Sequence, residues 1–424
     1  MHMNKAQARF NKIDSKLRDA GRFILFLVGW LSLLPLSAQE TTVAEDSLTA
    51  QLLEDMQRDD YVTVSLLVAS PGSAIYSAAG HAALRMECPQ HGIDYCYEFE
   101  NLVDLDQTID FLKGDMEAFF RRLYTTEFLD RYRQRGREVK AYQLNLTPEQ
   151  DIAVWQYLDN QADHVNHWPF DFLTNNCASM VVKTVYDNLG TDQVAYHHVD
   201  ERLQGTHRQV FPYILEHAPW ATFCWNILMG TGFDQHHLLE TKLFPVALPE
   251  VWGQTTLMDT DGNERPFLCS EGKVLVEAAK EDRAPVVTPQ RVLLVLLLLT
   301  LVVTVVEWRK GDTWAGRVVD IVLMAIETAL GVVVSYMLLF SHQVATSWNW
   351  LVMVLSPVPL LCWLLLRHRP AYRYLHMLFT AVLLLYLVLT PVIPQMQYAG
   401  MPLLLSAFAL RTLYRMKSIT NYKP

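Results

Sequence analysis

The C-terminal third of the chain constrains the fold most, because one apolar segment follows another there. Five such segments come after Pro289 in a sequence of 424 residues, and each is about long enough to cross a bilayer as a helix. The expected spans are 291–307, 318–340, 349–366, 373–394 and 398–413. The pattern predicts an all-α bundle of about five transmembrane helices over 288–424, preceded by a soluble domain over 39–287.

Basic residues separate the loops of this bundle into two kinds. The second loop (341–349) and the fourth loop (394–400) contain no Lys or Arg. The first loop, the third loop and the C-terminal tail are basic: Arg309, Lys310, Arg317, Arg367, Arg369, Arg373, Arg411, Arg415, Lys417 and Lys423. The positive-inside rule therefore predicts that these loops and the C-terminus are cytoplasmic and that the soluble domain is periplasmic.

The N-terminus predicts the same orientation independently. A basic stretch is followed by an apolar run over 23–36 and by the small residues Ser37 and Ala38. This is the pattern of a signal peptide over 1–38, and the apolar run is short for a span. An uncleaved signal anchor is the alternative. Either reading exports the next segment and predicts a multi-pass inner-membrane protein.

Charge and cysteine content limit the function of the soluble domain. The net charge of −10 argues against a nucleic-acid partner, which would require a basic face. Five of the six cysteines precede the spans, so one thiol remains free or pairs between chains in an oxidising compartment. Cys88 and Cys96 could bridge a hairpin, and Cys224 with Cys269 is a second conceivable pair.

The soluble domain has a mixed α+β pattern. Alternating and β-branched runs predict strands over 61–69, 81–86, 95–100 and 137–146. Helical spacing and capping residues predict helices over 43–58, 106–123, 147–161, 177–189 and 220–229. The segment 245–257 is expected to be a loop near the membrane.

Two short stretches contain residues that could be catalytic. Cys177 begins a predicted helix directly after Asn175 and Asn176, which can cap it. Free N–H groups and the helix dipole favour a thiolate there, and the thiolate is the nucleophile. His81 follows Gly80 on a predicted strand and is the best candidate for its base. Taken singly, such a cysteine is more often a small core residue and such a histidine is more often structural.

A metal site is not expected, and neither is any other cofactor. Histidines occur in three pairs, but their spacing matches no closed zinc pattern. The pairs are His164 and His167, His197 and His198, and His236 and His237.

Several stretches give the chain a family resemblance: SAAGHAALRM at 77–86, DYCYEFEN at 94–101, GREVKAYQLNLTPEQ at 136–150, FDFLTNNCAS at 170–179, and MGTGFDQ with LFP between 229 and 245. With them the chain resembles the Lnb-type lipoprotein N-acyltransferases of Gram-negative bacteria. The resemblance implies an extracytoplasmic domain with a permuted papain-like fold, related to that of NlpC/P60 peptidases, and it implies several following spans.

The resemblance assigns roles to matching residues. It implies that Cys177 is the nucleophile and His81 is the catalytic histidine. A third polar group should orient the imidazole, and we expect Glu98, with Asn101 as the alternative. Arg85 is a candidate to hold the carboxylate of Glu98 or Glu100, or a lipid phosphate, but a structural salt bridge is the favoured role. Asn176 is expected to cap the helix or to contribute to an oxyanion hole.

The implied reaction moves an acyl chain from a phospholipid, through a thioester on Cys177, to the N-terminal amine of a diacylated lipoprotein. A membrane-tethered cysteine peptidase or amidase acting on cell-wall peptides is one alternative. A non-catalytic lipid-binding or lipoprotein-binding protein is another. Within the spans, Asp320 is expected at the membrane interface. Glu327 lies deeper, where it could line a lipid-binding cavity or bond a neighbouring helix.

Overall fold

The computed structural model describes residues 61–100, 108–197, 200–234, 244–279, 286–398 and 400–420. All of these residues belong to one compact unit, Met56–Pro424. The predicted signal peptide, the predicted helix at 43–58 and Asn101 lie outside the described residues.

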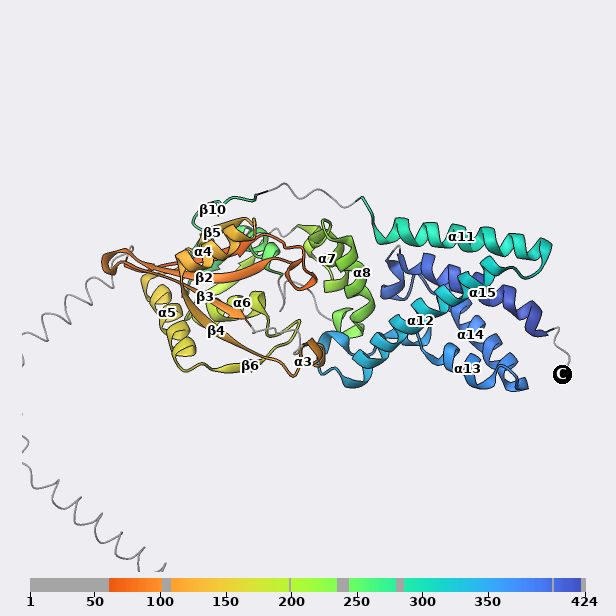
Figure 1. Ribbon diagram of the computed structural model, residues 1–424. Helices are drawn as coiled ribbons and strands as arrows, with labels where there is room; N and C mark the ends of the chain where they lie inside the picture. The colour runs from red at the N-terminus through yellow and green to blue at the C-terminus, as the bar shows by residue number, and fades with distance from the viewer. Residues whose placement is uncertain are drawn as a thin grey trace, which may run out of the picture. The chain divides into compact units, whose positions relative to one another are not determined.

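An antiparallel sheet of seven strands forms the centre of the soluble domain (Figure 1). Its spatial order is β10-β5-β1-β2-β3-β4-β6. The strands are β1 (Thr63–Ala69), β2 (His81–Cys88), β3 (Ile93–Glu100), β4 (Glu117–Tyr124), β5 (Val139–Gln143), β6 (His167–Pro169) and β10 (Lys273–Val276). The α+β class and the following helical region are as expected from the sequence.

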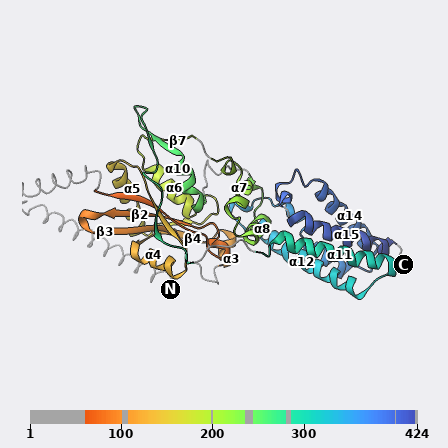
Figure 2. The same ribbon diagram turned by 90° about the horizontal axis from the view of Figure 1, so that it is seen from above.

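Helices cover both faces of this sheet. Figure 2 shows α5 (Pro148–Asp163) and α6 (Cys177–Asp187) on one side of the strands and α4 (Thr125–Gln134) on the other. Side chains alternate along a strand, so the even-numbered residues of β2 face α5 and α6. Ala83 faces α4 and packs near Phe128 and Tyr132. The two faces of β2 therefore bury different cores.

The predicted helix at 106–123 is wrong over its second half. The helix α3 covers only Thr108–Lys113, and Gly114 follows with a φ of +86°, which favours glycine and ends the helix. From Glu117 the chain forms β4, which pairs with β3 and β6. Burial alternates at the start of β4, which is the period of a strand.

Smaller elements complete the soluble domain. The segment 245–257, expected to be a loop, instead contains a helix and most of a strand. The remaining elements are α7 (His207–Ile214), α8 (Pro219–Leu228), α10 (Leu248–Gly253) and a three-stranded sheet of β7 (Gln193–Tyr196), β8 (Thr255–Met258) and β9 (Glu264–Pro266).

The C-terminal region is helical: α11 (Pro289–Lys310), α12 (Trp314–Phe340), α13 (Val358–Leu366), α14 (Pro370–Val388) and α15 (Gly400–Thr420). Among the described residues, three helices (α11, α12 and α14) are long and apolar enough to cross a membrane. A fourth span is counted if Val344–Met353 and Val358–Leu366, bent by 40°, form one. The charged α15 is 21 residues long.

The third expected span, 349–366, is not one continuous helix. A 3-10 turn at Trp350–Met353 is followed by α13, which has only nine residues. Pro357 and Pro359 lie at the break, and proline lacks the N–H that a continuing helix would need. The sequence is apolar enough for a span, but its prolines divide it.

The two loops without Lys or Arg contact the soluble domain. Gln343 accepts a hydrogen bond from the N–H of Phe172 (2.8 Å) and donates one to the carbonyl of Phe170 (3.1 Å). Asn349 donates to the carbonyl of Ile227, and Gln395 donates to that of Met229. These bonds join the helical region to the sheet domain at one end of α12.

The proposed Cys88–Cys96 bridge is wrong for this structure, in which all six cysteines are free. The register of the β2–β3 hairpin gives the reason. Cys96 lies opposite Arg85, whereas Cys88 lies opposite Ile93. Since Arg85 and Cys88 differ by an odd number of positions, the two thiols point to opposite faces of the sheet. Cys224 and Cys269 are also unpaired.

Candidate active site

Cys177 is the first residue of α6, and its neighbour Asn176 caps that helix. The Asn176 side-chain oxygen accepts hydrogen bonds from the N–H groups of Ala178 and Ser179, both at 2.9 Å. Its amide nitrogen donates to the carbonyl of Phe172. Asn176 thereby uses both ends of its side chain within the fold. The thiol is left at a helix start, where backbone N–H groups and the dipole favour negative charge.

His81 is the first residue of β2, and α6 packs against this strand. The imidazole is hydrogen-bonded to the side chain of Cys177. Its Nε2 lies 3.3 Å from Oε2 of Glu98. Glu98 reaches this position because it lies opposite Ala83 across the β2–β3 pair, on the same face as His81. Thiol, imidazole and carboxylate therefore form one connected series.

Two arginines hold the carboxylate of Glu98, whose side chain is 1% exposed. Arg121, directly opposite on β4, donates to Oε1 at 2.9 Å. Arg131 of α4 donates to the same oxygen at 2.6 Å. Because both guanidinium groups bind Oε1, Oε2 is left facing His81. The arginines fix the orientation of the carboxylate and compensate its charge.

The charges around the site shift three pKa values. Burial would raise the pKa of Glu98, but His81 and Arg131 outweigh it and lower that pKa to about 2. Burial would raise the pKa of the Cys177 thiol, yet His81 and the N–H groups of Ala82 and Ala178 lower it. Burial would lower the pKa of His81, but Tyr132, Cys177 and Glu98 raise it well above its usual value. Together these shifts favour a thiolate beside an imidazolium.

Tyr132 lies beside the imidazole and Arg137 lies over Tyr132, and neither residue was assigned a role from the sequence. The Tyr132 ring stacks near His81 with centroids 6.4 Å apart and planes at 23°. The guanidinium of Arg137 lies over the Tyr132 ring at 4.9 Å and donates to the carbonyl of Ser70. The sequence signal was a run of six arginines over 121–137 in an otherwise acidic domain. Only the pairing of β4 with β3 and the packing of α4 show which of them face the site.

Arg85 does not take part in this series. Its guanidinium binds Asp94 (2.7 Å and 2.8 Å) and Glu87 (2.7 Å), and it contacts neither Glu98 nor Glu100 within the described part of the chain. It is four residues from His81, or roughly 13 Å along a strand. The alternative in which Arg85 pairs with Glu98 or Glu100 is therefore wrong, and the favoured structural salt bridge is present. Arg85 forms a salt bridge at the far end of the β2–β3 hairpin.

Comparison with family models identifies both halves of the chain. Residues 49–212 match the Lnb N-terminal periplasmic domain, and residues 280–423 match the Lnb transmembrane domain. The first match contains the Cys177–His81–Glu98 series, and the second contains α11 to α15. Neither the curated proteins nor the solved structures contained a match. The two matches follow each other in one chain, which therefore belongs to the Lnb family of inner-membrane proteins of lipoprotein processing.

Proposed function

We propose that the protein is a thiol-dependent acyltransferase that moves an acyl chain from a phospholipid to the N-terminal amine of a diacylated lipoprotein. The observation that carries this proposal is the series of Cys177, His81 and Glu98, with the thiol at the start of α6 and the carboxylate buried behind the imidazole. A nucleophile, its base and an orienting group are the parts that covalent acyl transfer needs.

In the first step, the Cys177 thiolate attacks the ester carbonyl of the phospholipid. Backbone N–H groups of the first turn of α6 stabilise the oxyanion. The carbon–sulfur bond forms, the ester carbon–oxygen bond breaks, and the leaving alkoxide takes a proton from the His81 imidazolium. The products are a lysophospholipid and a thioester on Cys177.

In the second step, the lipoprotein amine attacks the thioester carbonyl. His81, now neutral, accepts a proton from the amine as the carbon–nitrogen bond forms and the carbon–sulfur bond breaks. The thiolate returns beside the imidazolium. Glu98 keeps Nε2 of His81 oriented through both steps, and Arg121 and Arg131 hold Glu98 in place.

The membrane half supports a lipid substrate. Donor and acceptor both carry acyl chains, which prefer the bilayer by roughly 0.8 kcal/mol per CH₂ group. Loops 341–349 and 394–397 of the helical region bind the sheet domain directly, so the thiol domain is held at one end of the bundle. These two loops contain no Lys or Arg. We propose on this ground that the thiol domain is periplasmic and that the basic loops and the C-terminus are cytoplasmic.

The test is expression of the full chain in cells depleted of their own lipoprotein N-acyltransferase, with lipoprotein N-termini read by mass spectrometry. We expect an added amide-linked acyl chain with the natural sequence and none with Cys177→Ala. Cys177→Ser, which keeps the shape of the side chain, serves as the folding control. Absence of the added chain with the natural sequence would overturn the proposal. Cleavage of cell-wall peptides in its place would identify a peptidase or amidase.

A further inference from the structure

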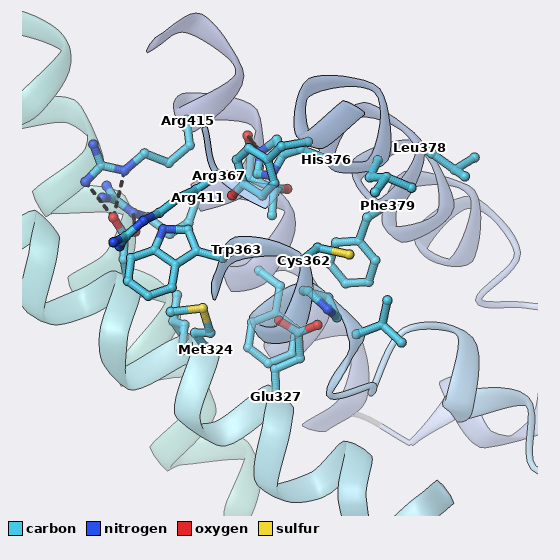
Figure 3. Close-up of a pocket in the computed structure, with 18 of the residues that line it drawn as sticks. Met324, Glu327, Cys362, Trp363, Arg367, His376, Leu378, Phe379, Arg411 and Arg415 are labelled. Atoms are coloured by element: carbon cyan, nitrogen blue, oxygen red, sulfur yellow. Dashed lines mark hydrogen bonds and ion pairs between the residues drawn. The ribbon is translucent and has the colours of Figure 1, made fainter. Parts of the chain in front are cut away.

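The helical region contains a cavity that the thiol site does not use. It has a volume of about 740 Å³ and lies among α12, α13, α14 and α15. Figure 3 shows side chains from these helices around it. The volume falls in the range of roughly 300–1,000 Å³ found for ligand sites. Its wall is mostly apolar, and six residues that form this wall are Ile321, Leu323, Met324, Phe379, Val382 and Phe408.

The cavity lies far from Cys177. Its lining residues on α12 run from Arg317 to Glu327. The opposite end of α12 is followed by Ser341 and Gln343, which bond to the sheet domain. At 1.5 Å per residue, Arg317 is roughly 36 Å from Ser341 along the helix axis. A ligand in this cavity is therefore not the acyl donor that reaches the thiol.

The arginines around the cavity are of two kinds. Arg411 and Arg415 are already paired: both bind Asp320, and Arg411 also binds Glu307 at 2.7 Å. Their charges are used in joining α15 to α11 and α12, as the dashed lines of Figure 3 show in part. Arg317 and Arg367 differ from them, because no carboxylate of the described residues lies within ion-pair distance of either. Both are exposed at the basic end of the bundle.

Aromatic and polar groups continue this wall between the basic end and the interior. The Arg367 guanidinium lies over the Trp363 ring at 4.8 Å, as is common at the level of lipid headgroups. His376 also lines the cavity and bonds to the carbonyl of Thr412 at 3.0 Å. The basic end is thus built to face a polar, negatively charged group, while the interior is apolar except at Glu327.

Glu327 places one carboxyl group in the deeper part of the cavity. It lines the cavity roughly 15 Å deeper than Arg317 along α12. The residue is 6% exposed, and its Oε1 has no hydrogen-bond partner among the described residues. A carboxyl at such a depth is costly unless it serves a bound molecule or a water-filled path. The helices themselves do not supply its partner.

We propose that this cavity binds an anionic phospholipid, with an acyl chain against the apolar wall and the phosphate between Arg317 and Arg367. Arginine binds phosphate through parallel N–H groups, and Arg317 and Arg367, which have no carboxylate partner among the described residues, both line the cavity and can match a single phosphate. The surrounding bilayer supplies such lipids at the level of basic juxtamembrane residues. The site belongs to the membrane leaflet on the side of the basic loops and is separate from the thiol reaction.

The binding test uses the full chain in nanodiscs of phosphatidylcholine, into which phosphatidylglycerol with the same acyl chains is titrated. Native mass spectrometry counts the lipid retained after release. We expect one phosphatidylglycerol per chain and about 30-fold weaker retention in Arg317→Gln/Arg367→Gln, at about 1 kcal/mol per basic residue. The control Arg309→Gln/Arg373→Gln removes two exposed basic residues of the same region that do not line the cavity. Equal loss in both double variants would overturn the site.

A second measurement locates the lipid inside the cavity. Cys362 lines the cavity and is free, so its alkylation by N-ethylmaleimide can be followed peptide by peptide. Phosphatidylglycerol should slow alkylation of Cys362 but not of Cys269, which is exposed in the soluble domain. Met324→Trp, which fills the cavity, should abolish retention while the thermal midpoint stays near that of the natural protein. Retention of a free fatty acid, or equal retention of phosphatidylcholine, would refute the phosphate site.

Discussion

In each half of the described chain, a pair of arginines holds a carboxylate: Glu98 in the sheet domain and Asp320 in the helical region. In the sheet domain, Arg121 and Arg131 both bind Oε1 of Glu98. In the helical region, Arg411 binds Oδ1 of Asp320 and Arg415 binds Oδ2. The components are alike, but the distribution of hydrogen bonds differs. Glu98 keeps one oxygen for His81, whereas both oxygens of Asp320 are occupied by arginine.

This difference separates a cluster that orients a reactive group from one that joins helices. The second carboxylate oxygen of Glu98, Oε2, faces the His81 imidazole, which is hydrogen-bonded to the Cys177 thiol. This cluster can therefore fix the orientation of the imidazole. In the Asp320 cluster, the charged groups bind one another: Arg411 and Arg415 bind Asp320, and Arg411 also binds Glu307. These ion pairs connect α11, α12 and α15. Five variants or measurements test this contrast, from the largest expected effect to the smallest.

His81→Gln should lower acyl transfer by about 10³-fold, because it removes the general base and the charge partner of the thiolate. The midpoint of thermal unfolding should change little, since His81 is not part of the hydrophobic core. Transfer is measured by mass spectrometry of lipoprotein N-termini with equal amounts of folded enzyme. Full activity in this variant would show that the cluster around Glu98 is structural as well.

Arg411→Leu should destabilise the helical region by roughly 3–5 kcal/mol, because it leaves Glu307 buried without its partner. Activity per folded molecule should remain, since Arg411 lies in the other half of the chain. Thermal unfolding followed by tryptophan fluorescence gives the stability. Arg309→Leu, an exposed arginine at the end of α11, is the control and should have little effect. A stable Arg411→Leu protein with lost activity would reverse the assignment of the two clusters.

Glu98→Gln should lower acyl transfer by about 100-fold, because a neutral amide no longer stabilises the imidazolium. Glu100→Gln is the matched control. Glu100 shares Arg121 (2.8 Å) and Arg131 (3.5 Å), while the closest carboxylate to His81 is that of Glu98. The pH profile of transfer should change in the first variant and keep its shape in the second. Equal changes in both variants would mean that Glu98 acts through the net charge of the site and does not orient the His81 imidazole.

The pH dependence of Cys177 alkylation should report the thiolate–imidazolium pair. His81 and the backbone N–H groups lower the pKa of the thiol, so iodoacetamide should react at a pH below that needed for an ordinary cysteine. As pH falls, reactivity is lost only when the thiolate takes up a proton at its lowered pKa. In His81→Gln the midpoint should rise. A midpoint in the natural protein at or above about 8.5, the ordinary cysteine value, would contradict the pair.

Asn176→Ala should cost about 1 kcal/mol through loss of the α6 cap. Thr147→Ala removes the equivalent capping box of α5 and should cost a similar amount. Only the Asn176 variant should also raise the midpoint of Cys177 alkylation, because only α6 begins at the thiol. If the two variants behave identically in alkylation, the helix start does not tune Cys177.

Much of the site could be predicted from short stretches of sequence. An asparagine pair before Cys177 is a local capping signal, and a histidine after a glycine on a strand is a local signal as well. Glu98 could be chosen because side chains on paired strands meet at fixed positions. Arg131 and Tyr132 could not be assigned, because α4 reaches the site through packing on the far face of the sheet. Arg121 could not be assigned, because its segment was predicted to be a helix and not the strand β4. For Arg85, even spacing along β2 predicts a face of the sheet, but only the structure identifies its salt-bridge partners as Glu87 and Asp94.

The sequence by itself determined the division into a soluble α+β domain and an apolar helical region, because hydrophobic runs and periodicity are properties of consecutive residues. It also determined where a helix could begin, through Thr147 and Asn176. Tertiary structure decided that 117–124 is a strand, because pairing with β3 and β6 outweighs local helical spacing. It also decided which oxygen of Glu98 faces His81 and which arginines at the membrane cavity are left unpaired. Those are contacts between residues far apart in the chain, which only the folded arrangement brings together.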